Sequence, residues 1–103
     1  MDKIATLSEI LKQNPTDAFT RYGLAMAHAA EGHTDQALAE YDTILQHSPN
    51  YVPAYQMSAQ LLLKLSRTED ARTRLHAGLT AAAHTGNSHA QSELQAMLDD
   101  LGA

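Results

Sequence analysis

Two prolines set the interval on which this chain is organised. Pro15 and Pro49 lie thirty-four positions apart and close the similar phrases LKQNP and LQHSP. A proline ends a helix because its ring removes a backbone N–H and clashes with the preceding turn. The same interval pairs residues of matching size elsewhere in the chain: Ala25 with Ala59, Ala37 with Ala71, and Leu45 with Leu79. The sequence therefore predicts two copies of one helical unit, residues 16–49 and residues 50–84.

Each copy is predicted to contain two helices joined by a short turn. Apolar side chains recur three and four residues apart in both copies, and no segment alternates apolar with polar residues as a strand would. The pattern is interrupted at Gly32 in the first copy and at Ser66 in the second. Glycine suits the left-handed residue that ends a helix, and Thr34 or Asp35 is expected to cap the helix that follows Gly32. Each copy is therefore a predicted helical hairpin.

One further helix is expected on each side of the two copies. Residues 3–13 carry an apolar face, whereas residues 87–101 combine an apolar side with a polar outer side, as a helix that caps a stack does. The apolar face of the first of these helices is formed by Ile4, Leu7, Ile10 and Leu11. The predicted architecture is a single all-α domain, residues 1–103, made of six helices with short connections.

The composition excludes several classes of function. Seven Lys and Arg against twelve Asp and Glu give a formal net charge of −5, whereas proteins that bind a phosphate backbone use clustered cationic side chains. The chain has no cysteine, which excludes thiolate metal sites and thiol catalysis. No apolar run approaches the roughly 20 residues that cross a bilayer. We therefore expect a soluble cytoplasmic protein that binds neither nucleic acid nor membranes.

The six histidines raise the question of a metal site. Two histidines on one helix share a face when they are three or four residues apart. The nearest pairs here, His28 with His33 and His84 with His89, are five apart. We therefore expect no metal site and no cofactor. His28 is expected to be partly buried and hydrogen-bonded, and the other histidines are expected at helix ends.

Catalytic motifs are missing from the sequence as well. It contains no phosphate-binding glycine loop, no nucleophile elbow and no HExxH zinc motif. Its adjacent acidic pairs point about 100° apart on a helix, which suits solvated charges better than acid–base catalysis. We therefore do not expect an enzyme. The one basic concentration is interpreted as a solvated helix face or as a docking point for an acidic partner: Lys64, Arg67, Arg72 and Arg74.

In its interval and its residues the chain resembles tetratricopeptide repeat (TPR) proteins. The family motif is matched at Leu24, Ala25, Gly32, Ala37, Tyr41, Ile44 and Pro49 in the first copy, and at Tyr55, Ala59, Ala71 and Leu75 in the second. Three positions depart from it: Arg21 replaces the aromatic residue that Tyr55 supplies in the second copy, Ser66 replaces a glycine, and Ala83 replaces a proline. The resemblance implies an α-α superhelix, a TPR-like solenoid of about six antiparallel helices.

The resemblance also implies a binding role, because the first helices of successive TPR repeats line a concave groove that receives a peptide or a partner's helix. Carried over position by position, the groove residues are Phe19, Tyr22, Met26 and Ala30 in the first copy, Gln56, Met57, Gln60, Leu63 and Lys64 in the second, and Asn87, Gln91 and Leu94 in the capping helix. Adaptable apolar side chains of this kind suit the binding of a protein partner.

One branch of the family is not matched. Chaperone-binding TPR domains hold a C-terminal carboxylate with Lys, Asn and Arg side chains at set groove positions. The corresponding positions here hold Tyr22, Met26, Met57, Asn87 and Gln91. Because the cationic clamp is missing, the expected partner is a hydrophobic or amphipathic protein segment.

Two alternatives stay open at this point. Aromatic and Met side chains at helical spacing are often core residues, and Leu63 in particular can cover the capping helix. Two repeats are also fewer than the roughly three that a stable stack needs. The chain can therefore self-associate as a homodimer through an uncovered end, with the helix at residues 3–13 as the expected edge.

Overall fold

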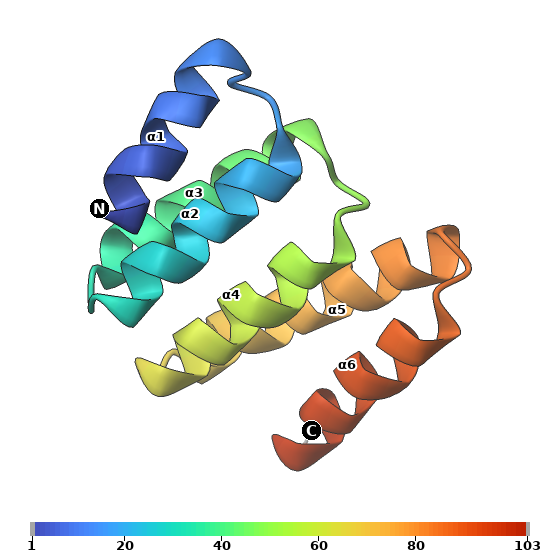
Figure 1. Ribbon diagram of the computed structural model, residues 1–103. Helices are drawn as coiled ribbons and strands as arrows, with labels where there is room; N and C mark the ends of the chain where they lie inside the picture. Colours follow the sequence, from blue (N-terminus) through green and yellow to red (C-terminus); the bar gives the residue numbers. More distant parts are fainter. Residues whose placement is uncertain (1, 103) are drawn as a thin grey trace. The chain divides into compact units, whose positions relative to one another are not determined.

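The computed structural model describes residues 2–102, and these residues form six helices and no strand. The helices are α1 (Lys3–Gln13), α2 (Ala18–Ala30), α3 (Thr34–His47), α4 (Val52–Lys64), α5 (Thr68–His84) and α6 (Ser88–Asp100) (Figure 1). The chain divides between Ser48 and Pro49 into two compact units, one holding α1 to α3 and the other α4 to α6. Among the described residues, no helix combines the length and the apolar character that a membrane span requires.

In the first unit, α2 packs against both α1 and α3. The two helices of the hairpin approach closely because small side chains lie between them: Ala25 of α2 and Ala37 of α3 are fully buried. Tyr41 and Ile44 fill the adjoining space and are almost completely buried. Ala37, Tyr41 and Ile44, which match the family motif, therefore form part of the core of this unit.

The expectation that α1 presents an uncovered apolar edge is wrong for most of its face. Leu11 is buried, and Ile4 and Leu7 are half-buried. A methyl carbon of Leu7 lies 3.6 Å from the point that a Cβ at Gly23 of α2 would occupy. The apolar face of α1 thus packs on α2, and among its four predicted residues only Ile10 remains largely exposed, at 47%.

In the second unit, α5 packs against both α4 and α6. Ala71, Leu75 and Ala82 of α5 are fully buried, and the first two of them match the family motif. The assignment of Leu94 to a binding groove is wrong, because this side chain is fully buried. Its Cδ1 atom lies 3.2 Å from the point that a Cβ at Gly78 would occupy. Leu94 is therefore a core residue that joins α6 to α5.

Helices α2, α4 and α5 end in turns of one type. The backbone N–H of His33 donates to the His28 carbonyl at 2.8 Å, which is the six-to-one bond of a Schellman motif. The equivalent bonds after α4 and α5 run from Arg67 to Leu62 and from Asn87 to Ala82. The left-handed residue inside these turns is Gly32, Ser66 or Gly86. The predicted turn positions are confirmed.

The N-cap of α3 differs from the prediction. His33 occupies it, and its side chain makes no capping hydrogen bond. The helix already begins at Thr34, because the turn leaves a single residue between the left-handed Gly32 and the first helical residue. The N-cap of α6, in contrast, is Asn87, whose side-chain oxygen accepts from the backbone N–H of Ala90 at 3.0 Å.

Replacing Ser66 by glycine should stabilise the protein. Ser66 has a φ of 60°, the one positive φ at a non-glycine position among residues 2–102. In this region the Cβ of an L-residue costs about 1 kcal/mol or more, and glycine avoids that cost. After the larger unfolded-state entropy of glycine is allowed for, we expect Ser66→Gly to raise the free energy of unfolding by about 0.5 kcal/mol. Urea denaturation checks this, with Gly32→Ser as the reverse change; a less stable Ser66→Gly protein would contradict it.

Candidate functional site

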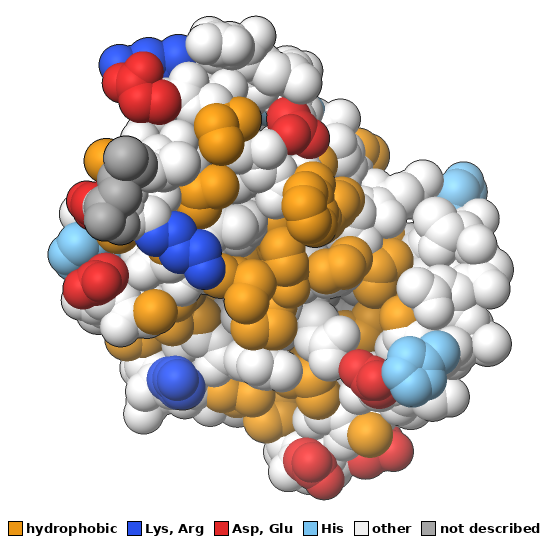
Figure 2. Space-filling view, viewed as in Figure 1, with side chains coloured by type: hydrophobic (Ala, Val, Ile, Leu, Met, Phe, Trp, Pro, Cys, Tyr) orange, Lys and Arg blue, Asp and Glu red, His pale blue; other side chains and the backbone are white. Residues whose placement is uncertain are grey.

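Three of the predicted binding residues follow one stripe of α2. Phe19, Tyr22 and Met26 are three and four residues apart, which places them on one side of the helix. Phe19 is 76% exposed and Met26 is 42% exposed, whereas Tyr22 is half-buried. Figure 2 shows hydrophobic side chains reaching the surface on the face from which α2 is seen. Phe19 and Met26 are thus surface residues and do not belong to the core.

Tyr22 connects this stripe to the core of the first unit. Its ring meets the ring of Tyr41 edge-on, with the centroids 6.1 Å apart and the planes inclined by 60°. Burial of Tyr41, with a smaller contribution from Tyr22, raises the pKa of the Tyr41 hydroxyl to about 12. Tyr41 therefore stays uncharged at neutral pH. Tyr22 packs on the Tyr41 ring and remains partly accessible to solvent.

Met26 also borders a hollow of about 470 Å³ at the end of the first unit where α2 finishes and α1 begins. The hollow is lined by Asp2, Lys3, Ile4, Met26, Ala27, Ala30 and Glu31. Its lining therefore combines apolar side chains with charges of both signs. The predicted residue Ala30 is exposed and lies here as well.

The predicted residues of the second unit lie mainly on α4. Gln60 and Lys64 are exposed, and Met57 and Leu63 are half-buried. Gln56 is also half-buried, and its amide donates to Glu93 of α6 at 2.9 Å. The accessible groups among these residues are therefore the polar side chains of Gln60 and Lys64 and parts of two apolar side chains. Gln56 already has a hydrogen-bond partner within the protein.

Gln91 is not brought together with the residues of α4. It lies two residues from Glu93, which places the two side chains about 200° apart around α6. Glu93 meets α4, whereas Gln91 borders a separate hollow together with Leu79 of α5. Asn87, the other polar candidate of this segment, is occupied as the N-cap of α6.

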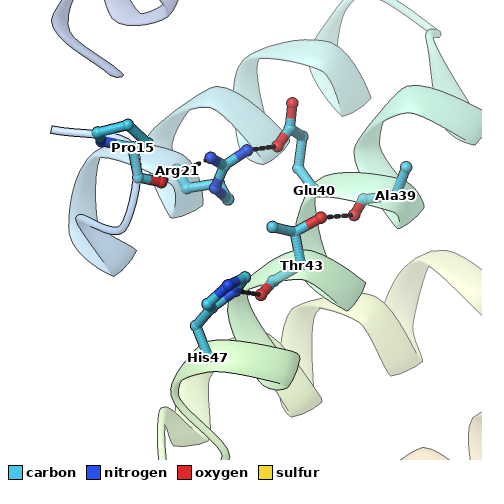
Figure 3. Close-up of polar contacts among 6 residues, drawn as sticks. All are labelled: Pro15, Arg21, Ala39, Glu40, Thr43 and His47. Atoms are coloured by element: carbon cyan, nitrogen blue, oxygen red, sulfur yellow. Dashed lines mark hydrogen bonds and ion pairs between the residues drawn. The ribbon is translucent and has the colours of Figure 1, made fainter. Parts of the chain in front are cut away.

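Sequence reasoning missed the contacts of Arg21, which replaces the usual aromatic residue. Its guanidinium donates to Glu40 of α3 at 2.6 Å through Nη1 and to the Pro15 carbonyl at 2.7 Å through Nη2 (Figure 3). In the second copy, the hydroxyl of Tyr55 donates to the Pro49 carbonyl at 2.6 Å. Arg21 and Tyr55 are separated by the same interval as the two prolines. Arg21 thus donates to the proline carbonyl of its copy as Tyr55 does in the second copy. The sequence feature that could have indicated the ion pair is the acidic residue Glu40 in the second helix of the same copy.

The basic residues on α4 and α5 do not form a free cationic patch. Arg67 pairs with Asp70 at 2.8 Å, and Arg72 lies 3.4 Å from Glu69. Both pairs join residues three apart on or beside the same helix. The Arg67 pair is a surface interaction, with both side chains more than half exposed, whereas the Arg72 side chain is only 23% exposed and its Nη1 atom is buried. The interpretation of this segment as a solvated helix face agrees with the exposure of Lys64 and Arg67, but it is wrong for Arg72, whose side chain is largely buried.

The histidines follow the expectation only in part. His28 is half-buried with a hydrogen-bonded ring, and His47 and His84 end α3 and α5. His33 and His89 lie at helix starts instead, where the dipole disfavours a positive charge. His76 lies in the middle of α5, so its placement at a helix end is wrong. Within residues 2–102, no group of three or more His, Cys, Asp and Glu side chains is arranged to hold a metal ion.

Comparison with known proteins supports this architecture. A solution NMR structure of a tetratricopeptide repeat domain protein from Salinibacter ruber is 33% identical and superposes with a TM-score of 0.81, covering 85% of this chain and 89% of that one. A protein from Bordetella parapertussis is 26% identical, with a TM-score of 0.81 and coverages of 96% and 86%. The TPR2B domain of yeast Sti1, solved as a complex with pHsp70, shares the fold at 23% identity, with a TM-score of 0.87 and coverages of 96% and 79%. No curated protein is significantly similar to this chain in sequence.

The family model described as tetratricopeptide repeat matches residues 4–57 and again residues 28–98. The two matches together span both hairpins and most of the flanking helices. The predicted fold class, an all-α repeat fold of the α-α superhelix type, is confirmed by these similarities and by the six helices of residues 2–102. The chain belongs to the tetratricopeptide repeat family.

Proposed function

We propose that this protein is a non-catalytic interaction module that binds a hydrophobic or amphipathic segment of a partner protein on the first helices of its repeats. TPR domains generally mediate protein–protein interaction, which supports the general class. The observation that carries the proposal is the α2 stripe, defined as Phe19, Tyr22 and Met26. A phenylalanine that is 76% exposed beside an accessible methionine is an apolar surface suited to binding an apolar partner face.

The chemistry of the two faces favours an apolar partner over an acidic tail. The α2 stripe carries no cation, and on α4 the one charged residue among the predicted positions is Lys64. The pHsp70 in the structure of the yeast Sti1 domain is a partner of that domain, and we do not propose it as a partner of this chain. An amphipathic helix, which presents its apolar residues three and four apart, matches the spacing of the α2 stripe.

Peptide binding tests the proposal directly. A panel of amphipathic 15-residue peptides and one acidic C-terminal peptide should be titrated into the protein by fluorescence anisotropy. We expect at least one amphipathic peptide to bind and the acidic peptide not to bind. Phe19→Ala should weaken that binding at least tenfold, because exposed aromatic anchors dominate such interfaces.

The matched control is Ile10→Ala, which removes an exposed apolar side chain from α1 and should leave the affinity unchanged. The melting temperature of Phe19→Ala should also match the wild type, since its side chain lies mostly in solvent. The proposal is overturned if no amphipathic peptide binds, or if the Phe19→Ala protein binds as tightly as the wild type.

Self-association is the second candidate, and the exposure of Ile10 on α1 favours it. Light scattering over a dilution series distinguishes the two. A mass that stays that of a monomer excludes the homodimer, whereas a concentration-dependent mass that Ile10→Glu abolishes supports it.

A further inference from the structure

The turn between α2 and α3 brings the rings of His28 and His33 into contact. The Nδ1 atoms of His28 and His33 lie 3.2 Å apart, and the ring centroids are 5.4 Å apart with the planes inclined by 52°. Two ring nitrogens at this distance share one proton, so one ring donates while the other accepts. The contact is accessible, because His33 is exposed and His28 is half-buried.

The pair forms because of its position in the turn and not because of its spacing alone. His28 and His33 are the two residues joined by the six-to-one backbone bond of the Schellman motif, and the side chains of these two positions normally meet. His84 and His89 are also five residues apart, but they are not the two residues joined by the six-to-one bond after α5, which runs from Asn87 to Ala82. His84 ends α5, and the Nε2 atom of His89 lies 2.6 Å from Glu93. Two histidines five residues apart do not share a face within one helix, but they can meet when a helix ends between them.

We propose that His28 and His33 chelate a divalent transition-metal ion through their two Nδ1 atoms. Nitrogen ligands lie about 2.0–2.1 Å from Zn²⁺, and two of them at a tetrahedral angle are about 3.4 Å apart. The observed 3.2 Å is close to that separation. The ion takes the place of the shared proton after a small rotation of both rings, which turns both Nδ1 lone pairs towards a common point. The ring that carried the proton on Nδ1 changes tautomer by losing that proton to water and taking one from water on Nε2, so both rings stay neutral.

The site is an open one with two protein ligands. No third His, Cys, Asp or Glu joins the pair among the described residues, so water completes the coordination sphere. The order of divalent affinities then follows ligand chemistry, with Cu²⁺ held more tightly than Zn²⁺. A bound ion ties the end of α2 to the start of α3 and therefore stabilises the first unit.

Zinc titration of the protein without an affinity tag tests the proposal. We expect the ¹⁵N resonances of the Nδ1 atoms of His28 and His33 to shift with added Zn²⁺. With free ion about a hundredfold above the dissociation constant, the melting temperature should rise by at least about 5 °C.

Three variants make the test specific. His33→Ser keeps a residue suited to the N-cap, and His28→Leu copies Leu62, which holds the same place in the turn after α4. Each should lose at least tenfold in zinc affinity while remaining folded. His89→Ser alters the other pair of equal spacing and should leave the zinc response unchanged. An identical rise in melting temperature for His33→Ser and the wild type, no rise at all, or shifts at His84 and His89 instead would overturn the proposal.

Discussion

Replacing Gly78 by alanine should destabilise the protein by about 2 kcal/mol, as overpacking of a close helix contact does. The Cβ of an alanine at this position would lie 2.8 Å from the Cβ of Tyr55, closer than two such atoms approach. A Cβ cannot rotate away from its backbone, so α5 and α4 must move apart. Overpacking of this kind costs about 3 kcal/mol, and the better helix propensity of alanine offsets up to about 1 kcal/mol. Thermal denaturation followed by circular dichroism should show a melting temperature lower by roughly 10 °C.

Gly23→Ala is the matched control, because Gly23 is also a helical glycine. The nearest atom to its added Cβ is Cδ1 of Leu7 at 3.6 Å, an ordinary contact. The same substitution should therefore stabilise the protein by about 0.5–1 kcal/mol through helix propensity. A Gly78→Ala protein as stable as the wild type would show that α4 and α5 do not approach as the structure has them.

Removing the carboxylate of Glu40 should destabilise the protein by about 2 kcal/mol, because it leaves a largely buried arginine without its ion-pair partner. Arg21 and Glu40 are about four-fifths buried, with side chains 19% and 20% exposed, and their atoms are 2.6 Å apart. Breaking a fully buried ion pair costs about 3–5 kcal/mol. The cost is smaller here since Arg21 keeps its bond to the Pro15 carbonyl. Urea denaturation of Glu40→Ala measures the loss.

Two comparisons identify the cause of that loss. Glu9→Ala breaks the pair between Glu9 and Lys12, whose side chains are 71% exposed, and should change the stability by less than about 0.5 kcal/mol. Adding Arg21→Tyr to Glu40→Ala should recover about 1 kcal/mol, because a tyrosine hydroxyl can reach the Pro15 carbonyl without a buried charge, as Tyr55 reaches Pro49. If Glu40→Ala and Glu9→Ala cost the same, the Arg21 pair contributes nothing beyond a surface interaction.

Much of the fold could be predicted because it depends on local signals. Helix periodicity and the prolines predicted α1 as residues 3–13, the C-terminal end of α3 and the turns at Gly32 and Ser66, as observed. The thirty-four-residue interval paired the small residues Ala37 and Ala71, and both are fully buried. These features require only the residues within one helix or one turn, so a single sequence contains them.

The candidate site could be predicted less completely, because surface position depends on what packs beside a helix. Phe19 and Met26 are exposed as expected, but Leu94 is buried against α5 and Gln91 is turned away from α4. Periodicity shows which residues share a face and does not show which neighbouring helix covers that face. Glu40 was likewise an unremarkable acidic residue until the structure placed it against Arg21.

The order of residues along the chain is enough to predict two similar helical hairpins and most of their helix ends, since these follow from propensities and spacings, and its resemblance to tetratricopeptide repeat proteins implies the repeat fold. Three features became known only from packing in three dimensions: Arg21 bonds to Glu40 and to the Pro15 carbonyl, a Cβ added at Gly78 would meet Tyr55, and His28 contacts His33. Each of them depends on distances between atoms on different helices or across a turn, and no spacing along the chain determines such distances.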